Sequence, residues 1–138
     1  MKLTIINGVN LNMLGQREPS VYGTKTLADI ENDIRDYCAK KGVDCEFFQS
    51  NIEGEICEII QKCKSDGIVI NAGAYTHYSI AIRDAIKGIG LPTVEVHISN
   101  IFAREEFRQK SVIADVCCGT VIGFGEKGYL LAIDSFLL

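Results

Sequence analysis

The chain has 138 residues, of which 47% are hydrophobic, 23% are charged and only 2 are proline. This composition excludes a mainly disordered chain, and the length is sufficient for one domain that folds without disulfides. Fourteen basic residues against 18 acidic residues give a net charge of -4, which argues against nucleic acid or an anionic membrane as a partner.

The N-terminal half alternates between short apolar runs and amphipathic segments. Residues 3–7 form a β-branched run that is typical of a strand buried on both faces. Apolar positions recur every three or four residues over 26–41, which predicts a helix. Thr26 with Asp29 is the expected N-cap pair of this helix, and Gly42 its C-terminal cap. A strand over 43–49, a helix around 56–63 and a strand over 67–71 are expected to follow.

The C-terminal half continues this alternation, with a helix expected over 78–87, strands over 92–99 and 119–124, and a last helix over 129–138. Five strands that alternate with helices predict parallel β-α-β units. We therefore expect an α/β fold of the flavodoxin-like, doubly wound type, with a five-stranded parallel sheet in three α/β/α layers. Residues 1–138 are expected to form a single domain.

Two segments lack any periodicity, residues 8–24 and residues 100–112, and long loops in a compact domain are commonly functional. The second is expected to be partly helical.

The six cysteines show no Cys-x-x-Cys pair and no zinc-finger spacing. The apolar run at the N-terminus is too short for a signal peptide, and no stretch approaches the roughly 18 apolar residues of a membrane span. We therefore expect a cytoplasmic protein, with no metal site and no membrane partner, whose thiols pack in the core.

Polar side chains gather at the carboxyl ends of the expected strands, which is where open parallel sheets bind ligands. The chain has two histidines, His77 and His97, and both fall at this rim. Strand alternation places Glu95, His97 and Ser99 on one face at steps of about 6.6 Å. Buried polar groups need hydrogen-bond partners, so a purely structural network is the alternative to a ligand site. Each histidine is a candidate general acid, and Glu95 either orients an imidazole or forms a plain salt bridge.

The long loop contributes Asn10, Arg17 and Tyr22. A tyrosine base at neutral pH requires its pKa to fall from about 10 to near 7, which takes about 4 kcal/mol from nearby positive charge. An arginine is the obvious source of that charge. Arg104 and Arg108 lie one helical turn apart and can hold an anion, although by themselves they are typical of a solvated surface.

Four segments, in order along nearly the whole chain, resemble the signatures of the type II 3-dehydroquinate dehydratases: residues 10–23, 71–77, 94–100 and 103–108. The Gly-Tyr-Leu-Leu-Ala sequence of 128–132 is also similar to this family. Val9 departs from the family pattern, which usually has proline there. The departure affects the stiffness of the loop but no reacting group.

The resemblance implies that 3-dehydroquinate is dehydrated to 3-dehydroshikimate through an enolate, without metal, cofactor or Schiff base. Tyr22, with its pKa lowered by Arg17, would remove a proton from the carbon next to the ketone. Asn10 would help to stabilise the enolate, and His97, held by Glu95, would protonate the departing hydroxyl.

The resemblance also implies a set of substrate-binding residues, in which Asp84 comes from a neighbouring subunit of a dodecamer built of trimers. Arg104 would belong to the closing lid, together with Arg17 and Tyr22. The full set implied for substrate binding is Asn71, His77, Asp84, Ile98, Ser99, Arg104 and Arg108.

Three other functions fit the same fold. A flavodoxin-like small-molecule, flavin or nucleotide-binding module without catalysis would need a phosphate loop after the first strand, where Gly8 to Asn12 offers none. A phosphoacceptor domain would need acidic residues where Asn7 and Asn71 stand. An inactive relative used for assembly is disfavoured because every expected reacting group is present.

Overall fold

The computed structural model describes residues 1–16, 18, 20 and 23–138. Its parallel sheet has the strand order β2-β1-β3-β4-β5, which confirms the doubly wound, flavodoxin-like prediction. The strands are β1 (Lys2–Asn7), β2 (Asp44–Gln49), β3 (Gly67–Asn71), β4 (Thr93–His97) and β5 (Gly119–Ile122).

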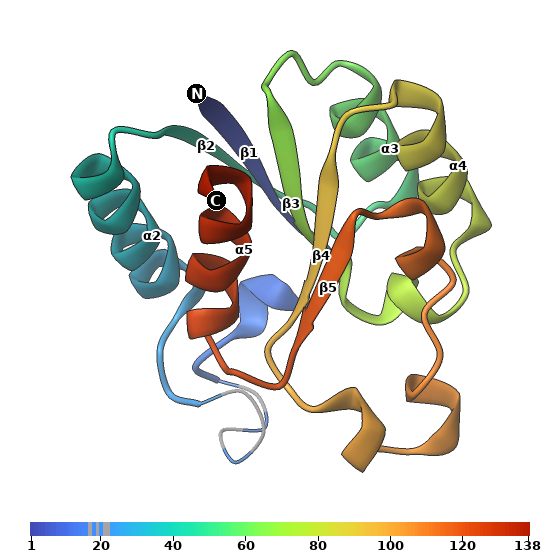
Figure 1. Cartoon of the computed structure of the whole chain (residues 1–138). Helices are drawn as coiled ribbons and strands as arrows, with labels where there is room; N and C mark the ends of the chain where they lie inside the picture. Colours follow the sequence, from blue (N-terminus) through green and yellow to red (C-terminus); the bar gives the residue numbers. More distant parts are fainter. Residues whose placement is uncertain (17, 19, 21–22) are drawn as a thin grey trace.

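Helices cover both faces of this sheet, as Figure 1 shows. Helices α2 (Leu27–Lys41) and α5 (Lys127–Leu137) lie on one face, and α3 (Glu53–Gln61) and α4 (Ile80–Ile89) lie on the other. Each face has its own apolar cluster, in which Ile5 packs toward α2 and α5 whereas Ile6 packs toward α3 and α4. Alternation along β1 therefore supplies both halves of the core.

The helix ends follow the expected capping chemistry. Thr26 and Asp29 form a reciprocal capping box at the start of α2, and Gly42 ends this helix in the left-handed conformation at a φ of 70°. Helix α4 begins at Ile80, two residues later than predicted, because Gly73–His77 forms a separate 3-10 turn and the Ser79 hydroxyl caps the helix. This turn holds His77 at the rim of the sheet.

The chain reverses its winding direction between β1 and β3, which are neighbours in the sheet. The loops that follow these two strands touch through their backbones. A Cβ atom at Gly8 would lie 2.2 Å from the carbonyl oxygen of Ala72, and one at Gly73 would lie 2.6 Å from that of Val9. Two glycines therefore allow Asn10 and Asn71 to reach the same opening.

We expect Gly8→Ala to lower the free energy of unfolding by about 1–3 kcal/mol or more. The added methyl group would overlap backbone atoms of Ala72, which cannot move without distorting the loop. Urea denaturation measures this change. Gly54→Ala is the matched control, because a Cβ at Gly54 in α3 meets nothing within 4 Å. Equal stability of the two variants would contradict the close contact between the loops.

All six cysteines are free, but only Cys38 is fully buried. The prediction that all the thiols pack in the core is wrong for Cys118, which is exposed just before the edge strand β5. Within the described residues, no helix combines the length and apolarity that crossing a bilayer requires.

Candidate active site

A cleft of about 640 Å³, including its open mouth, lies at the carboxyl ends of the strands beside the reversal point. The cleft brings together eight of the residues that the sequence singled out: Asn10, Asn71, His77, His97, Ile98, Ser99, Arg104 and Arg108.

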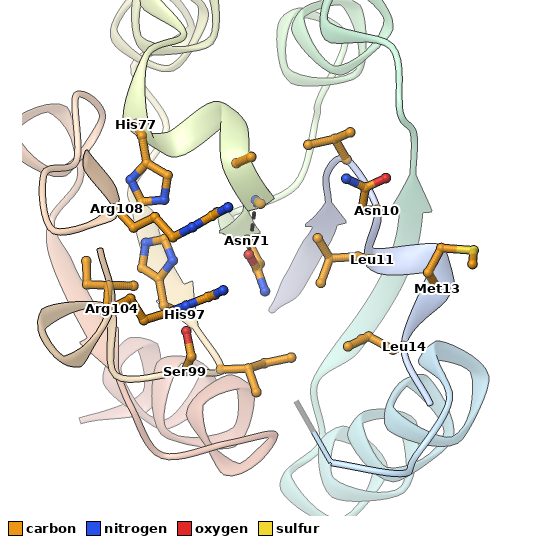
Figure 2. Close-up of a pocket in the computed structure, with 15 residues that line it drawn as sticks. Asn10, Leu11, Met13, Leu14, Asn71, His77, His97, Ser99, Arg104 and Arg108 are labelled. Carbon is orange, nitrogen blue, oxygen red and sulfur yellow. Dashed lines mark hydrogen bonds between the residues drawn. The ribbon is translucent and has the colours of Figure 1, made fainter. Parts of the chain in front are cut away.

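The two walls of the cleft differ in character, as Figure 2 shows. Leu11, Met13 and Leu14, from the turn after β1, form an apolar wall. On the opposite wall, the guanidinium groups of Arg104 and Arg108 point toward Asn71. A ligand in the cleft would therefore have one apolar side and one side rich in hydrogen-bond donors.

The charge of the cleft is opposite to that of the whole molecule. Among its lining residues in the described part of the chain, two are arginines, two are histidines and none is acidic or a lysine. The side chains of Arg104 and Arg108 are only 15% and 25% exposed, and both line the cleft. Arg104 also lies 3.7 Å from Glu18, and Arg108 bonds Glu105 at 2.8 Å. The cleft fits a small anion with hydroxyl groups.

His97 and Glu95 form a buried pair at the base of the cleft. His97 Nε2 lies 2.6 Å from Glu95 Oε2, and Glu95 is completely buried in β4. Burial by itself would raise the pKa of the Glu95 carboxyl, but the hydrogen bond and charge of His97, together with the Ser111 and Thr120 hydroxyls, hold this pKa below its usual range. An ionised Glu95 can only accept, so His97 Nε2 donates to it and the ring is held in one orientation.

His77 has a different environment, although its ring stacks on that of His97 with centroids 6.5 Å apart. Burial lowers the pKa of His77, and the nearby His97 and Arg108 lower it further. The Nδ1 atom lies 2.8 Å from the carbonyl oxygen of Lys110, which can only accept, so Nδ1 carries the proton. Neutral His77 thus offers Nε2 as an acceptor, and His97 is the better general acid.

Asn71 is oriented from beneath the cleft by a residue of α5. Its Oδ1 accepts from the backbone N–H of Gly73 at 3.1 Å, and its Nδ2 donates to the Tyr129 hydroxyl at 3.0 Å. That hydroxyl donates in turn to Asn7 Oδ1 at 2.5 Å. Since Tyr129 is fully buried, the Asn71 amide is held in one orientation.

We expect Tyr129→Phe to lower the free energy of unfolding by about 1–3 kcal/mol, because Asn7 and Asn71 would each lose a buried partner. Looser orientation of Asn71 should also raise KM. Chemical denaturation and steady-state kinetics measure the two effects. Tyr78→Phe, on a side chain that is 61% exposed, is the control, and equal behaviour of the two variants would exclude this role for Tyr129.

Of the other four predicted site residues, Glu95 lies beneath the cleft and not in its lining. Asp84 is exposed on α4 and lines a separate hollow with Gln61 and Gly88. The expected contribution of Asp84 to the site of a neighbouring subunit therefore stays a prediction. Arg17 and Tyr22 lie outside the described residues.

Sequence reasoning missed Tyr129, Ser111 and Thr120, which touch site residues from beneath. Thr120 is paired with Glu95 in the β4–β5 register, and that pairing cannot be read from a single strand. Among the residues that the structure describes, no group of three or more His, Cys, Asp or Glu side chains is arranged to hold a metal ion.

The fold and cleft together define a flavodoxin-like α/β protein with a cleft that is lined by arginines and histidines and has a buried His–Glu pair at its base. A family model described as Dehydroquinase class II matches residues 1–137, and the chain belongs to this family.

Named relatives and solved structures agree with this membership. The chain is 58% identical over 139 residues to a 3-dehydroquinate dehydratase of Sulfurimonas denitrificans, covering 99% of this chain and 87% of the relative. It is 55% identical over 141 residues to one of Clostridium beijerinckii, covering 100% and 97%. The crystal structure of a type II dehydroquinase from Butyrivibrio crossotus matches with a TM-score of 0.98 and 49% identity, covering 100% of this chain and 98% of that one.

Proposed function

We propose that this chain catalyses the elimination of water from 3-dehydroquinate to give 3-dehydroshikimate, with residues 1–138 acting as one catalytic domain. Membership of the dehydroquinase family and the names of its relatives support the activity. The observation that carries the proposal is the buried Glu95–His97 pair at the base of a basic cleft. A noncatalytic binding module, the main alternative, is not favoured by the family match.

The proposed substrate fits the two walls of the cleft. Its carboxylate would bind the guanidinium groups of Arg104 and Arg108, whose charges are concentrated by the partly buried setting. Its hydroxyls would bind Asn71, the Nε2 acceptor of His77 and Ser99. The backbone around Ile98 would assist at the carboxylate, and the apolar wall would exclude water from the ring.

The elimination requires a base, stabilisation of an oxyanion and an acid. Tyr22, as phenolate beside Arg17, would take the proton from the carbon next to the ketone, and the electrons of that C–H bond would form an enolate. Asn10 would help to stabilise the enolate oxygen. His97 would then protonate the hydroxyl on the next carbon, so that the C–O bond breaks, water leaves and the conjugated enone forms.

We further propose that the reaction uses no metal, cofactor or Schiff base, because these side chains supply each required proton transfer. A type I mechanism would need a lysine in the cleft, and none lines the described part of it. We also propose a cytoplasmic homo-oligomer, a dodecamer of trimers, in which Asp84 of one subunit completes the site of another. Light scattering of the purified protein tests the assembly, and a monomer would contradict it.

The activity is tested by mixing purified protein with 3-dehydroquinate and following the ultraviolet absorbance of the conjugated product. We expect a rise in absorbance that persists after a chelator is added and after borohydride treatment in the presence of substrate, which would trap an imine. No rise in absorbance would contradict the activity. Loss of activity with the chelator or with borohydride would contradict the proposed chemistry.

A further inference from the structure

The Glu95 carboxylate receives two hydroxyl groups besides the ring of His97. Ser111 Oγ donates to Oε2 at 2.7 Å, and Thr120 Oγ1 donates to Oε1 at 3.1 Å. Neither hydroxyl lines the cleft, so neither can touch a substrate there. Both reach Glu95 from chain segments that follow β4, and Thr120 does so from the neighbouring strand β5.

The hydrogen bonds of Ser111 fix the direction of its proton. Its oxygen accepts from the backbone N–H groups of Ile113 at 3.3 Å and Ala114 at 3.1 Å, which occupies both lone pairs. The hydroxyl hydrogen is then directed to Glu95. The same Oε2 atom lies 2.6 Å from His97 Nε2, so this oxygen faces two donors when Glu95 is ionised.

Among the residues that the structure describes, no acidic side chain lines the cleft beside the pair. The charged and titratable groups around it are His77 on its 3-10 turn, Arg104 and Arg108 on the segment after β4, and Cys117 before β5. Burial, with the negative charge of Glu95 as the next cause, raises the pKa of the Cys117 thiol to about 12, so this thiol stays neutral. The orientation and charge of Glu95 therefore depend on its three donors.

We infer that Ser111 and Thr120 are positioning residues for the elimination, which hold Glu95 ionised and aimed at His97. This inference rests on the proposed function. Ser111 also follows Lys110, whose carbonyl fixes the tautomer of His77, and it lies three residues after Arg108. One short segment thus positions both histidines and carries a substrate-binding arginine.

Thr120→Val removes one donor and keeps the shape of the side chain. We expect it to lower kcat about 3- to 10-fold, and Ser111→Ala to lower kcat about 10-fold or more, with KM within about twofold in both. Loss of a donor to the carboxylate raises the pKa of Glu95, so the acidic limb of the kcat profile should move to higher pH. Thr120→Ser restores the hydroxyl and should recover most of the activity.

Thr93→Val is the matched control, because the Thr93 hydroxyl lies on the same strand as Glu95 but donates to the carbonyl oxygen of Leu91 at 3.0 Å. It should leave both kcat and the acidic limb unchanged. If Thr120→Val and Ser111→Ala also keep the wild-type acidic limb, or if Thr93→Val shifts it equally, the positioning role is wrong.

A readout independent of turnover separates this inference from the activity. The chain has 2 histidines, so the ring nitrogens of His97 can be followed by nuclear magnetic resonance and assigned with His77→Gln. Protonation of Glu95 should perturb the His97 signals at higher pH in Thr120→Val than in the wild type. If the wild type lacks dehydratase activity but the His97 signals still shift between the wild type and Thr120→Val, only the proposed function is refuted. An active wild type with no shift in the variant would refute the positioning role.

Discussion

His97→Gln is expected to lower kcat by about 10²- to 10⁴-fold, which is the usual contribution of a general acid. Glutamine can still donate a hydrogen bond to the buried Glu95, so the variant removes the transferable proton without leaving that carboxylate unpaired. KM should change little, because the arginines proposed to bind the substrate's carboxylate remain. Steady-state kinetics by ultraviolet absorbance measure the effect.

His77→Gln is the internal control for this prediction, because it alters the other histidine of the same cleft. A neutral ring with a lowered pKa is suited to binding, so this variant should raise KM more than it lowers kcat. If His77→Gln lost kcat and His97→Gln kept it, the assignment of the acid would be reversed.

Tyr22→Phe is expected to lower kcat by a similar factor of about 10² to 10⁴, since phenylalanine lacks the oxygen that would accept the proton. The role of Tyr22 rests on the family resemblance and on the need for a base, because the residue lies outside the described part of the chain. Tyr37→Phe is the control, since the Tyr37 hydroxyl bonds Asp134 between α2 and α5 at 2.7 Å. Full activity of Tyr22→Phe would remove this tyrosine as the base.

The fold follows from local patterns that needed no tertiary information. The apolar run before Asn7, the reciprocal capping by Thr26 and Asp29, and Gly42 at the end of the helix each specify an element boundary. The alternation of strands and helices then limits the topology, because right-handed crossovers leave few arrangements. The later start of α4 was missed because Gly73–His77 forms its own 3-10 turn, and apolar spacing in a single sequence does not show where that turn ends.

The candidate site was predicted in outline, since the strand-end rule selected both histidines and Glu95. What the sequence could not supply is the contact between segments that are distant along the chain. Arg104 and Arg108 resemble surface residues until the cleft is formed, and Tyr129 reaches Asn71 across 58 positions. Thr120 was missed for the same reason, because its partner lies on another strand.

In the proposed mechanism, one residue acts as the base and another as the acid. The His97→Gln variant in deuterium oxide tests this claim. If the base forms the enolate and His97 releases the hydroxyl, the variant should still remove the α-proton, and the trapped enolate should take up deuterium. Recovered 3-dehydroquinate should then gain deuterium at the carbon next to the ketone faster than 3-dehydroshikimate appears. The double variant His97→Gln/Tyr22→Phe should incorporate deuterium more slowly than His97→Gln alone. Unlabelled substrate beside undiminished product formation would contradict the acid role of His97.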